Sequence, residues 1–179
     1  MGGVKIMELN KVLKRRKSVR KYDVEKNITD EQLEYILFAG MAAPISRKAY
    51  SSIKITVVQQ KALLQELSDA FSEKVNPFYG APTVIIVSSE QSEVKNIDCF
   101  NVACIIENML LASTDLELGS IYLTSFLRAI ENRSDLLKKL EITEGYKPLS
   151  AIGVGYDIGS EEEQEREEIE KRIEVVKLH

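Results

Sequence analysis

Histidine is almost absent from this chain of 179 residues, and the single one is His179 at the last position. A Ser-His-Asp or Cys-His catalytic arrangement needs a histidine held by the fold, whereas terminal residues are usually frayed. The same scarcity argues against a histidine-based metal centre. We therefore expect no metal site, and if the protein is an enzyme we expect a bound cofactor to supply its difficult chemistry.

Cysteine is also scarce, with only Cys99 and Cys104. Because they lie five positions apart on one predicted helix, the two thiols cannot meet in a disulfide. They have too few neighbouring ligands for a zinc site, and no apolar signal segment precedes them. We interpret both as reduced thiols in the core of a cytoplasmic protein.

The chain has no excess of positive charge, and its net charge of −4 disfavours a dedicated nucleic-acid binder. Charge is nevertheless uneven: residues 11–21 carry seven basic side chains, and residues 161–170 carry seven acids and one arginine. With 44% hydrophobic residues, the composition is typical of one globular domain spanning residues 1–179. Within it, residues 161–179 form an acidic tail that is either a solvated helix face or packs on a partner subunit.

The most apolar stretch runs from Cys99 to Thr114, where only Glu107 is charged. Polar residues interrupt it, whereas a membrane span needs about 20 largely unbroken apolar residues. A helix that is apolar on nearly every side is buried. We therefore predict no membrane segment, but a buried central helix that ends near Gly119 and is followed by an extended segment.

Hydrophobic periodicity predicts the remaining elements. Helices are expected at 7–16, from the N-cap Thr29 to Pro44, at 61–74, at 123–129 and from the capping pair Ser134-Asp135 to 140; strands are expected at 53–58, 83–87 and 148–156. Helices and strands alternate without a strict βαβ repeat. The sequence thus predicts an α/β or α+β fold with a mostly antiparallel sheet.

The basic run carries the first functional signal. Ser18 offers a hydroxyl between Arg16 and Arg20, and guanidinium groups bind phosphate oxygens in a bidentate manner. A phosphate ligand would suit this cluster, and a solvated basic face explains it equally well. A DNA-binding arm is disfavoured, because no aromatic residues alternate with the charges.

Two other groups of residues have competing interpretations. Gly153, Gly155 and Gly159 follow an apolar strand, but acids come next where a dinucleotide-binding motif needs a helix, so close packing of the strand against a helix explains them better. Polar groups also lie in apolar surroundings, at Asn101, Asn108, Thr124 and Ser125. These either bridge the backbone or face a planar polar ligand such as a flavin.

Taken together, five segments make the chain resemble the FMN-dependent nitroreductase family. They are RRKSVRKY, FAGMAAPIS, FYGAPTVIIV, DCFNVACIIENMLLASTDLELGSIYLTSF and GYKPLSAIGVGYDIG, in the family's order and spacing. The resemblance implies an α+β nitroreductase-like fold, in which helices flank a mostly antiparallel sheet around the central helix. It also implies an intertwined homodimer with one FMN in each of two pockets at the subunit interface.

The function implied by the resemblance is transfer of hydride from NADH or NADPH through FMN to nitroaromatics, quinones or similar acceptors. The flavin N5 carries the chemistry, so no catalytic side chain is expected. The alternative is a flavin-binding carrier or sensor without efficient turnover, because loop 45–52 has Ile45 and RKAYSS where the family has serine, asparagine and Gln-Pro. The family's Gly-Leu-Gly after the central helix also reads Glu117-Leu118-Gly119 here.

The resemblance implies five cofactor-binding elements. The basic motif holds the FMN phosphate and ribityl chain, the loop after the second helix reaches the partner's flavin, and the central helix gives a polar contact. The following segment approaches N5, and a late basic residue returns to the phosphate. These roles fall on Arg16, Lys17, Ser18 and Arg20, on Pro44, Ile45 and Ser46, on Asn101, on Thr124 and Ser125, and on Lys171, Arg172 or Arg166.

Overall fold

The computed structural model of the protein describes residues 7–94, 96–159 and 174–178. The elements are α1 (Leu9–Arg15), α2 (Asp30–Met41), β1 (Ile53–Val58), α3 (Lys61–Phe71), β2 (Thr83–Glu90), α4 (Ile97–Asp115), β3 (Gly119–Leu123), α5 (Leu127–Ile130), α6 (Ser134–Lys139) and β4 (Tyr146–Gly155), with 3₁₀ turns at Ser46–Lys48 and Tyr50–Ser52. The strands form one antiparallel sheet in the order β1-β2-β4-β3. The predicted α+β fold is confirmed.

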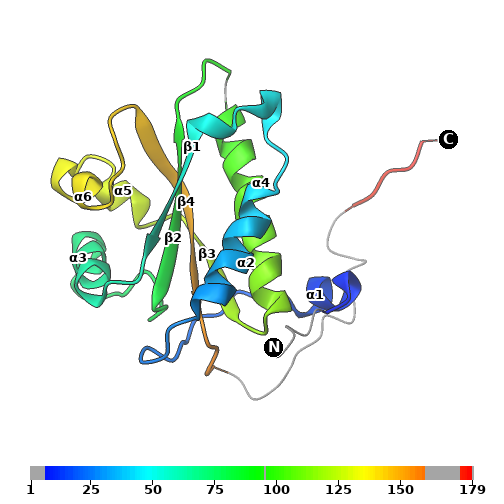
Figure 1. The fold of residues 1–179 in the computed structure, drawn as a ribbon, viewed down its shortest axis with the longest axis horizontal. Helices are drawn as coiled ribbons and strands as arrows, with labels where there is room; N and C mark the ends of the chain where they lie inside the picture. The colour runs from blue at the N-terminus through cyan, green and yellow to red at the C-terminus, as the bar shows by residue number, and fades with distance from the viewer. Residues whose placement is uncertain (1–6, 95, 160–173, 179) are drawn as a thin grey trace.

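The sheet separates two hydrophobic cores, because side chains alternate between its two faces. Helices α2 and α4 cover one face, and α3, α5 and α6 cover the other (Figure 1). On the α4 side, Ile85 packs with Met109 and its neighbours. On the opposite side, Ile86 belongs to a core in which the rings of Phe78 and Phe126 meet edge to face at 4.9 Å between centroids.

Helix α2 begins where the sequence predicts. Thr29 is its N-cap: the Thr29 hydroxyl accepts the N–H of Gln32 at 3.2 Å, and the Gln32 side chain accepts the N–H of Thr29 at 2.9 Å. This reciprocal capping box satisfies two donors that a helix start leaves unpaired. Further along, α2 crosses α4 at Gly40, where an added Cβ would overlap the side chain of Met109. A larger residue at position 40 would force the side chain of Met109 to move, so glycine suits this close approach of the two helices.

Three details of the predicted elements are wrong. The central helix is not buried on every side, since Phe100 is 62% exposed and Cys99 is exposed as well, so the two thiols are not both in the core. Helix α1 buries only Val12 instead of an apolar stripe. The predicted capping pair does not cap α6, because the N-cap is Arg133 and the side chain of Arg133 makes no capping hydrogen bond.

The glycines of β4 are packed tightly, as predicted, but against different partners. A Cβ on Gly153 would lie 3.0 Å from the Cβ of Ala81, and one on Gly155 would lie 2.7 Å from the Cδ of Pro82. These neighbours precede β2 and belong to no helix. The prediction of strand-against-helix packing is therefore wrong, and the loop before β2 explains why small residues are needed.

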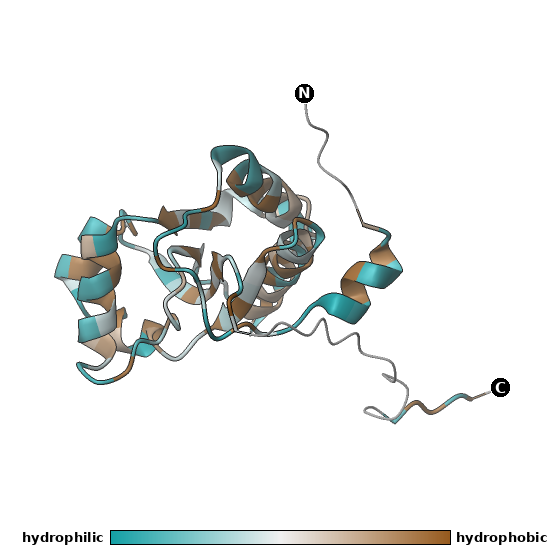
Figure 2. Ribbon diagram, turned by 90° about the horizontal axis from the view of Figure 1, so that it is seen from below, coloured by the Kyte–Doolittle hydropathy of each residue, from teal (hydrophilic) through white to brown (hydrophobic). Residues whose placement is uncertain are grey.

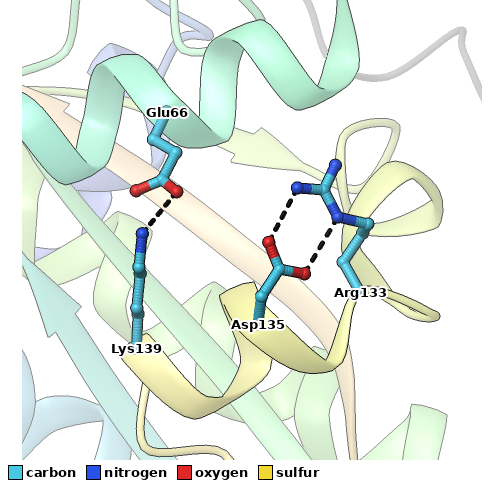
Figure 3. Close-up of polar contacts among 4 residues, drawn as sticks. All are labelled: Glu66, Arg133, Asp135 and Lys139. Atoms are coloured by element: carbon cyan, nitrogen blue, oxygen red, sulfur yellow. Dashed lines mark hydrogen bonds and ion pairs between the residues drawn. The ribbon is translucent and has the colours of Figure 1, made fainter.

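Exposed ion pairs lie on the α3, α5 and α6 side of the sheet (Figure 3). The Nζ of Lys139 on α6 lies 2.5 Å from the Oε1 of Glu66 on α3, so the pair links two helices. Arg133 donates to both carboxylate oxygens of Asp135, at 2.9 and 2.8 Å. These hydrogen bonds lower the pKa of Asp135 from 3.8 to about 2.

Among the described helices, α4 alone has the length and apolar composition of a membrane span. It packs against α2 and against β2, β3 and β4, and ten of its 19 residues are buried. We therefore assign α4 to the core, as the interrupted apolar stretch predicts.

Candidate functional site

The basic segment, residues 16–20, lies along the free edge of β3. Ser18 pairs with Ser120 of β3, and the N–H of Val19 donates to the carbonyl oxygen of Ser120 at 3.0 Å. Val19 is buried and fixes the main chain. The polar side chains around it stay accessible: Ser18 and Arg20 are exposed, and Arg16 and Lys17 are half-buried.

The cations of the basic segment differ in their surroundings. The Nζ of Lys17 lies 2.9 Å from the Oδ2 of Asp157, so part of its charge is compensated. The guanidinium of Arg20 lies 5.8 Å from the centre of the Tyr79 ring. Through its side chain, Arg16 forms neither an ion pair nor a hydrogen bond with any residue that the structure describes. Neither arginine is ion-paired with a described residue, so both charges are available to an anionic ligand.

Tyr22 anchors the chain beyond the basic segment. Its main chain bridges that of Asp157, and its hydroxyl donates to the carbonyl oxygen of Val19 at 3.1 Å. Burial, followed by the nearby Asp157 carboxylate, raises the pKa of Tyr22 above its ordinary value. The hydroxyl therefore stays protonated and keeps donating, which holds the basic segment in one conformation.

The loop that contains the predicted flavin contacts Pro44, Ile45 and Ser46 lies against the first turns of the central helix α4. The N–H of Ser46 donates to the Oδ1 of Asn101 at 3.0 Å, and Asn101 is buried. Asn108 acts as a donor instead: its side-chain N–H donates to the carbonyl oxygen of Ala39 in α2 at 2.9 Å. Ile45 lies in the core and Pro44 is exposed. Bridging of the backbone, one of the two interpretations, is confirmed for both asparagines.

The structure does not bring the predicted site residues together within one chain. Asn101 and Ser46 lie at one end of α4, and the basic segment lies beyond the other end. The 14 residues from Asn101 to Asp115 span about 21 Å at 1.5 Å per residue. Thr124 and Ser125 are exposed and follow the far end of β3. The late basic candidates Arg166, Lys171 and Arg172, most of the acidic tail and His179 lie outside the described residues.

A cavity of about 550 Å³ lies where the start of α2 meets the end of α4. Its lining includes four acidic residues, Glu31, Glu34, Asp115 and Glu117. Their negative charges would repel a phosphate. In the described part of the chain, no three His, Cys, Asp or Glu side chains are placed to hold a metal ion. The basic segment is therefore the better place for an anionic ligand.

Asp115 is a structurally important residue that the sequence analysis missed. It is only 6% exposed, and its two carboxylate oxygens accept the N–H of Met7 at 2.6 Å and the hydroxyl of Tyr35 at 2.7 Å. The sequence did contain one signal for Asp115, which is its position. An acid at the last residue of an apolar helix is unfavourable because its charge opposes the helix dipole, so it needs compensating partners.

The sequence of this chain matches a known protein family over most of its length. The nitroreductase family model matches residues 13–78 and 74–156, which is most of the chain. This chain belongs to the nitroreductase family. No curated protein matches this chain.

Solved structures share the fold of this chain over nearly its whole length. A nitroreductase with bound FMN from Bacteroides fragilis is 29% identical, with 96% of this chain and 100% of that chain covered and a TM-score of 0.81. An FMN-dependent nitroreductase from Clostridium difficile is 24% identical, with 94% and 99% covered and a TM-score of 0.77. A protein from Clostridium acetobutylicum, named as a candidate NADH oxidase, is 27% identical, with 93% and 99% covered and a TM-score of 0.74.

Proposed function

We propose that this member of the nitroreductase family is an FMN-dependent NAD(P)H oxidoreductase. When bound, FMN supplies hydride transfer from a reduced nicotinamide to a nitroaromatic, quinone or similar acceptor. The observation that carries the proposal is the basic segment, fixed on the edge of β3 with the charge of Arg16 uncompensated among the described residues. The FMN-bound relative from Bacteroides fragilis, similar over 96% of this chain, supports the choice of cofactor.

In this proposal the chain binds and orients the cofactor without a protein nucleophile. Arg16 and Arg20 hold the phosphate by charge-assisted hydrogen bonds, and the Ser18 hydroxyl donates beside them. Lys17 contributes less, because Asp157 already compensates part of its charge. Thr124 and Ser125 supply hydroxyl or backbone donors near the ring, where they stabilise the negative charge that develops during reduction.

The proposal includes a homodimer with two composite sites. About 21 Å separates Asn101 from the end of α4 near the basic segment. One chain therefore does not place both its basic segment and its loop at Ser46 around the same FMN. A second copy brings its loop of Pro44, Ile45 and Ser46 to the basic segment of the first. The apolar residues exposed on α2 and α4 support burial against such a copy: Phe38 is 66% exposed, Met41 61% and Phe100 62%.

The visible absorption spectrum of the purified protein tests the cofactor, before and after incubation with FMN and desalting. We expect flavin absorbance that survives desalting, with the released cofactor identified as FMN. A protein that stays colourless contradicts the proposal. Oxidation of NADH or NADPH with a quinone acceptor then tests turnover, and bound FMN without turnover would favour the carrier or sensor.

Three single variants test the phosphate assignment. Arg16→Ala and Arg20→Ala each remove a charge-assisted hydrogen bond worth about 1.5–3 kcal/mol, so FMN affinity should fall by roughly 10- to 150-fold. Lys138→Ala is the control, because Lys138 is exposed on α6 on the opposite face of the sheet. Equal FMN dissociation constants in all three variants would reject the assignment.

A further inference from the structure

Asp115 is in an unfavourable position for a carboxylate. It is the last residue of α4, and residues 112–115 include no basic side chain that would compensate it. A negative charge at the C-terminal end of a helix opposes the helix dipole, and a buried carboxylate is destabilising unless it is hydrogen-bonded. Asp115 is nevertheless 6% exposed, so its hydrogen bonds are necessary to the local structure.

The two hydrogen bonds of Asp115 join three parts of the chain. Its Oδ1 accepts the main-chain N–H of Met7, 108 positions earlier, and its Oδ2 accepts the Tyr35 hydroxyl from α2, 80 positions earlier. The bond to Asp115 is the main reason that the pKa of Tyr35 is raised, and Tyr35 therefore remains a donor. Asp115 thus connects the segment before α1 to α2 and α4.

Helix α1 has few other contacts that fix its position, and one of them is the ion pair between Arg15 and Glu117, whose charged atoms lie 3.9 Å apart. Val12 is its one buried residue, while Leu9 is 65% exposed and Leu13 is 45% exposed. Figures 1 and 2 both place α1 at the margin of the molecule, away from α3, α5 and α6. Its orientation therefore depends on the packing of Val12, on the contacts of Arg15 and on the hydrogen bond that Asp115 accepts from Met7.

The orientation of α1 determines that of Arg16. Arg16 is the C-cap residue of α1, and its N–H donates to the carbonyl oxygen of Val12 at 2.9 Å. Residues 18 and 19 are held separately, by pairing with Ser120 of β3. A change in α1 would consequently move Arg16 and leave Arg20, which follows the paired residues, in place.

We propose that Asp115 is a positioning residue for the cofactor phosphate. By accepting from Met7 and Tyr35 it fixes α1, and α1 sets the direction in which Arg16 reaches the phosphate. Asp115 itself does not contact the ligand. The inference rests on the proposed function, since it assigns the phosphate of FMN to the basic segment.

The test is the FMN affinity of Asp115→Asn, measured by titration of flavin fluorescence. The amide is neutral and has only one accepting oxygen, so both hydrogen bonds lose their charged acceptor and at most one of the two donors still meets an accepting oxygen. We therefore expect FMN binding about 10-fold weaker. Glu34→Gln is the matched control: it removes the same charge from the same cavity, from an exposed residue of α2. Its affinity should stay at the wild-type value.

Double variants separate positioning from a general loss of structure. Because Asp115 acts through Arg16, Asp115→Asn should add no further loss of affinity to Arg16→Ala. The same change combined with Arg20→Ala should multiply the two losses. Faster hydrogen exchange of the α1 amides is expected in Asp115→Asn, with the protection of α4 unchanged.

Wild-type affinity in Asp115→Asn, or a multiplied loss when it is combined with Arg16→Ala, would overturn the inference alone. Absence of FMN binding in the wild-type protein would instead overturn the proposed function, and the inference with it. If Asp115→Asn does not fold, Tyr35→Phe removes one of the same hydrogen bonds and enters the same cycles. Tyr35→Phe should show weaker FMN binding and the same lack of additivity with Arg16→Ala.

Discussion

Glu117 is the residue at which the chain leaves α4, and its backbone is left-handed with φ of 58°. The N–H of Glu117 donates to Thr114 at 3.0 Å, and the N–H of Leu118 donates to Ser113 at 2.8 Å. This is the Schellman pattern, in which a glycine usually occupies the left-handed position. The departure from the family's Gly-Leu-Gly therefore places a strained glutamate where a glycine would be relaxed.

Glu117→Gly should raise the free energy of unfolding by about 0.5–1 kcal/mol. A left-handed non-glycine residue is strained by about 1–2 kcal/mol, and the conformational freedom of glycine in the unfolded chain offsets part of the gain. Urea denaturation measures the change. Glu117→Gln is the control: it removes the same charge but keeps the strain, so a gain of equal size there would contradict the explanation.

Single residues of the candidate site were predictable only where their chemistry clusters in the sequence. The basic segment is visible because its charges are adjacent along the chain. The contact between Asn101 and Ser46 was not, because the two residues are 55 positions apart and meet only after α4 has folded. Asp115 was missed for the same reason, since its partners Met7 and Tyr35 are both far away in sequence.

Among the elements, we expect α6 to make a pH-dependent contribution to stability. Asp135 lies in its first turn, where negative charge favours the helix dipole, and Arg133 helps to lower its pKa to about 2. A lowered pKa means that the contribution is fully present above pH 3.8 and is lost as the pH falls through 2. The melting temperature of Asp135→Asn should be lower than that of the wild type at pH 7, and the difference should close between pH 4 and 2. A difference that stays constant down to pH 2 would contradict this assignment.

The element predictions were most accurate where short-range patterns decide. The strand at Ile53–Val58 is predicted to the residue, and the N-cap Thr29 fixes the start of α2. The strand at 83–87 is longer than predicted and extends to Glu90, because β4 continues to pair with it past an irregularity at Val87. Pairing with a distant strand leaves no local pattern. For the same reason, the exposed face of α4 could not be separated from its buried face by composition.

For the whole molecule, the basic segment and the loop at Ser46 lie at opposite ends of α4. Their separation makes the proposed site, shared between two subunits, testable by mixing subunits. Arg20→Ala weakens the basic segment, and Asn101→Leu removes the acceptor that holds the loop at Ser46. We expect each variant homodimer to bind FMN weakly. A heterodimer of the two has one site with both defects and one site with neither, provided that each site combines the basic segment of one subunit with the loop of the other.

The heterodimer, isolated with two different affinity tags, should therefore hold one tightly bound FMN, measured from flavin absorbance per protein dimer. Wild-type subunits carrying the same two tags are the control and should hold two. If the basic segment and the loop instead act on the same FMN within one chain, every subunit of the heterodimer carries a defect and no tight site forms. Because α4 keeps the two groups about 21 Å apart in a single chain, we expect the heterodimer to recover the intact site.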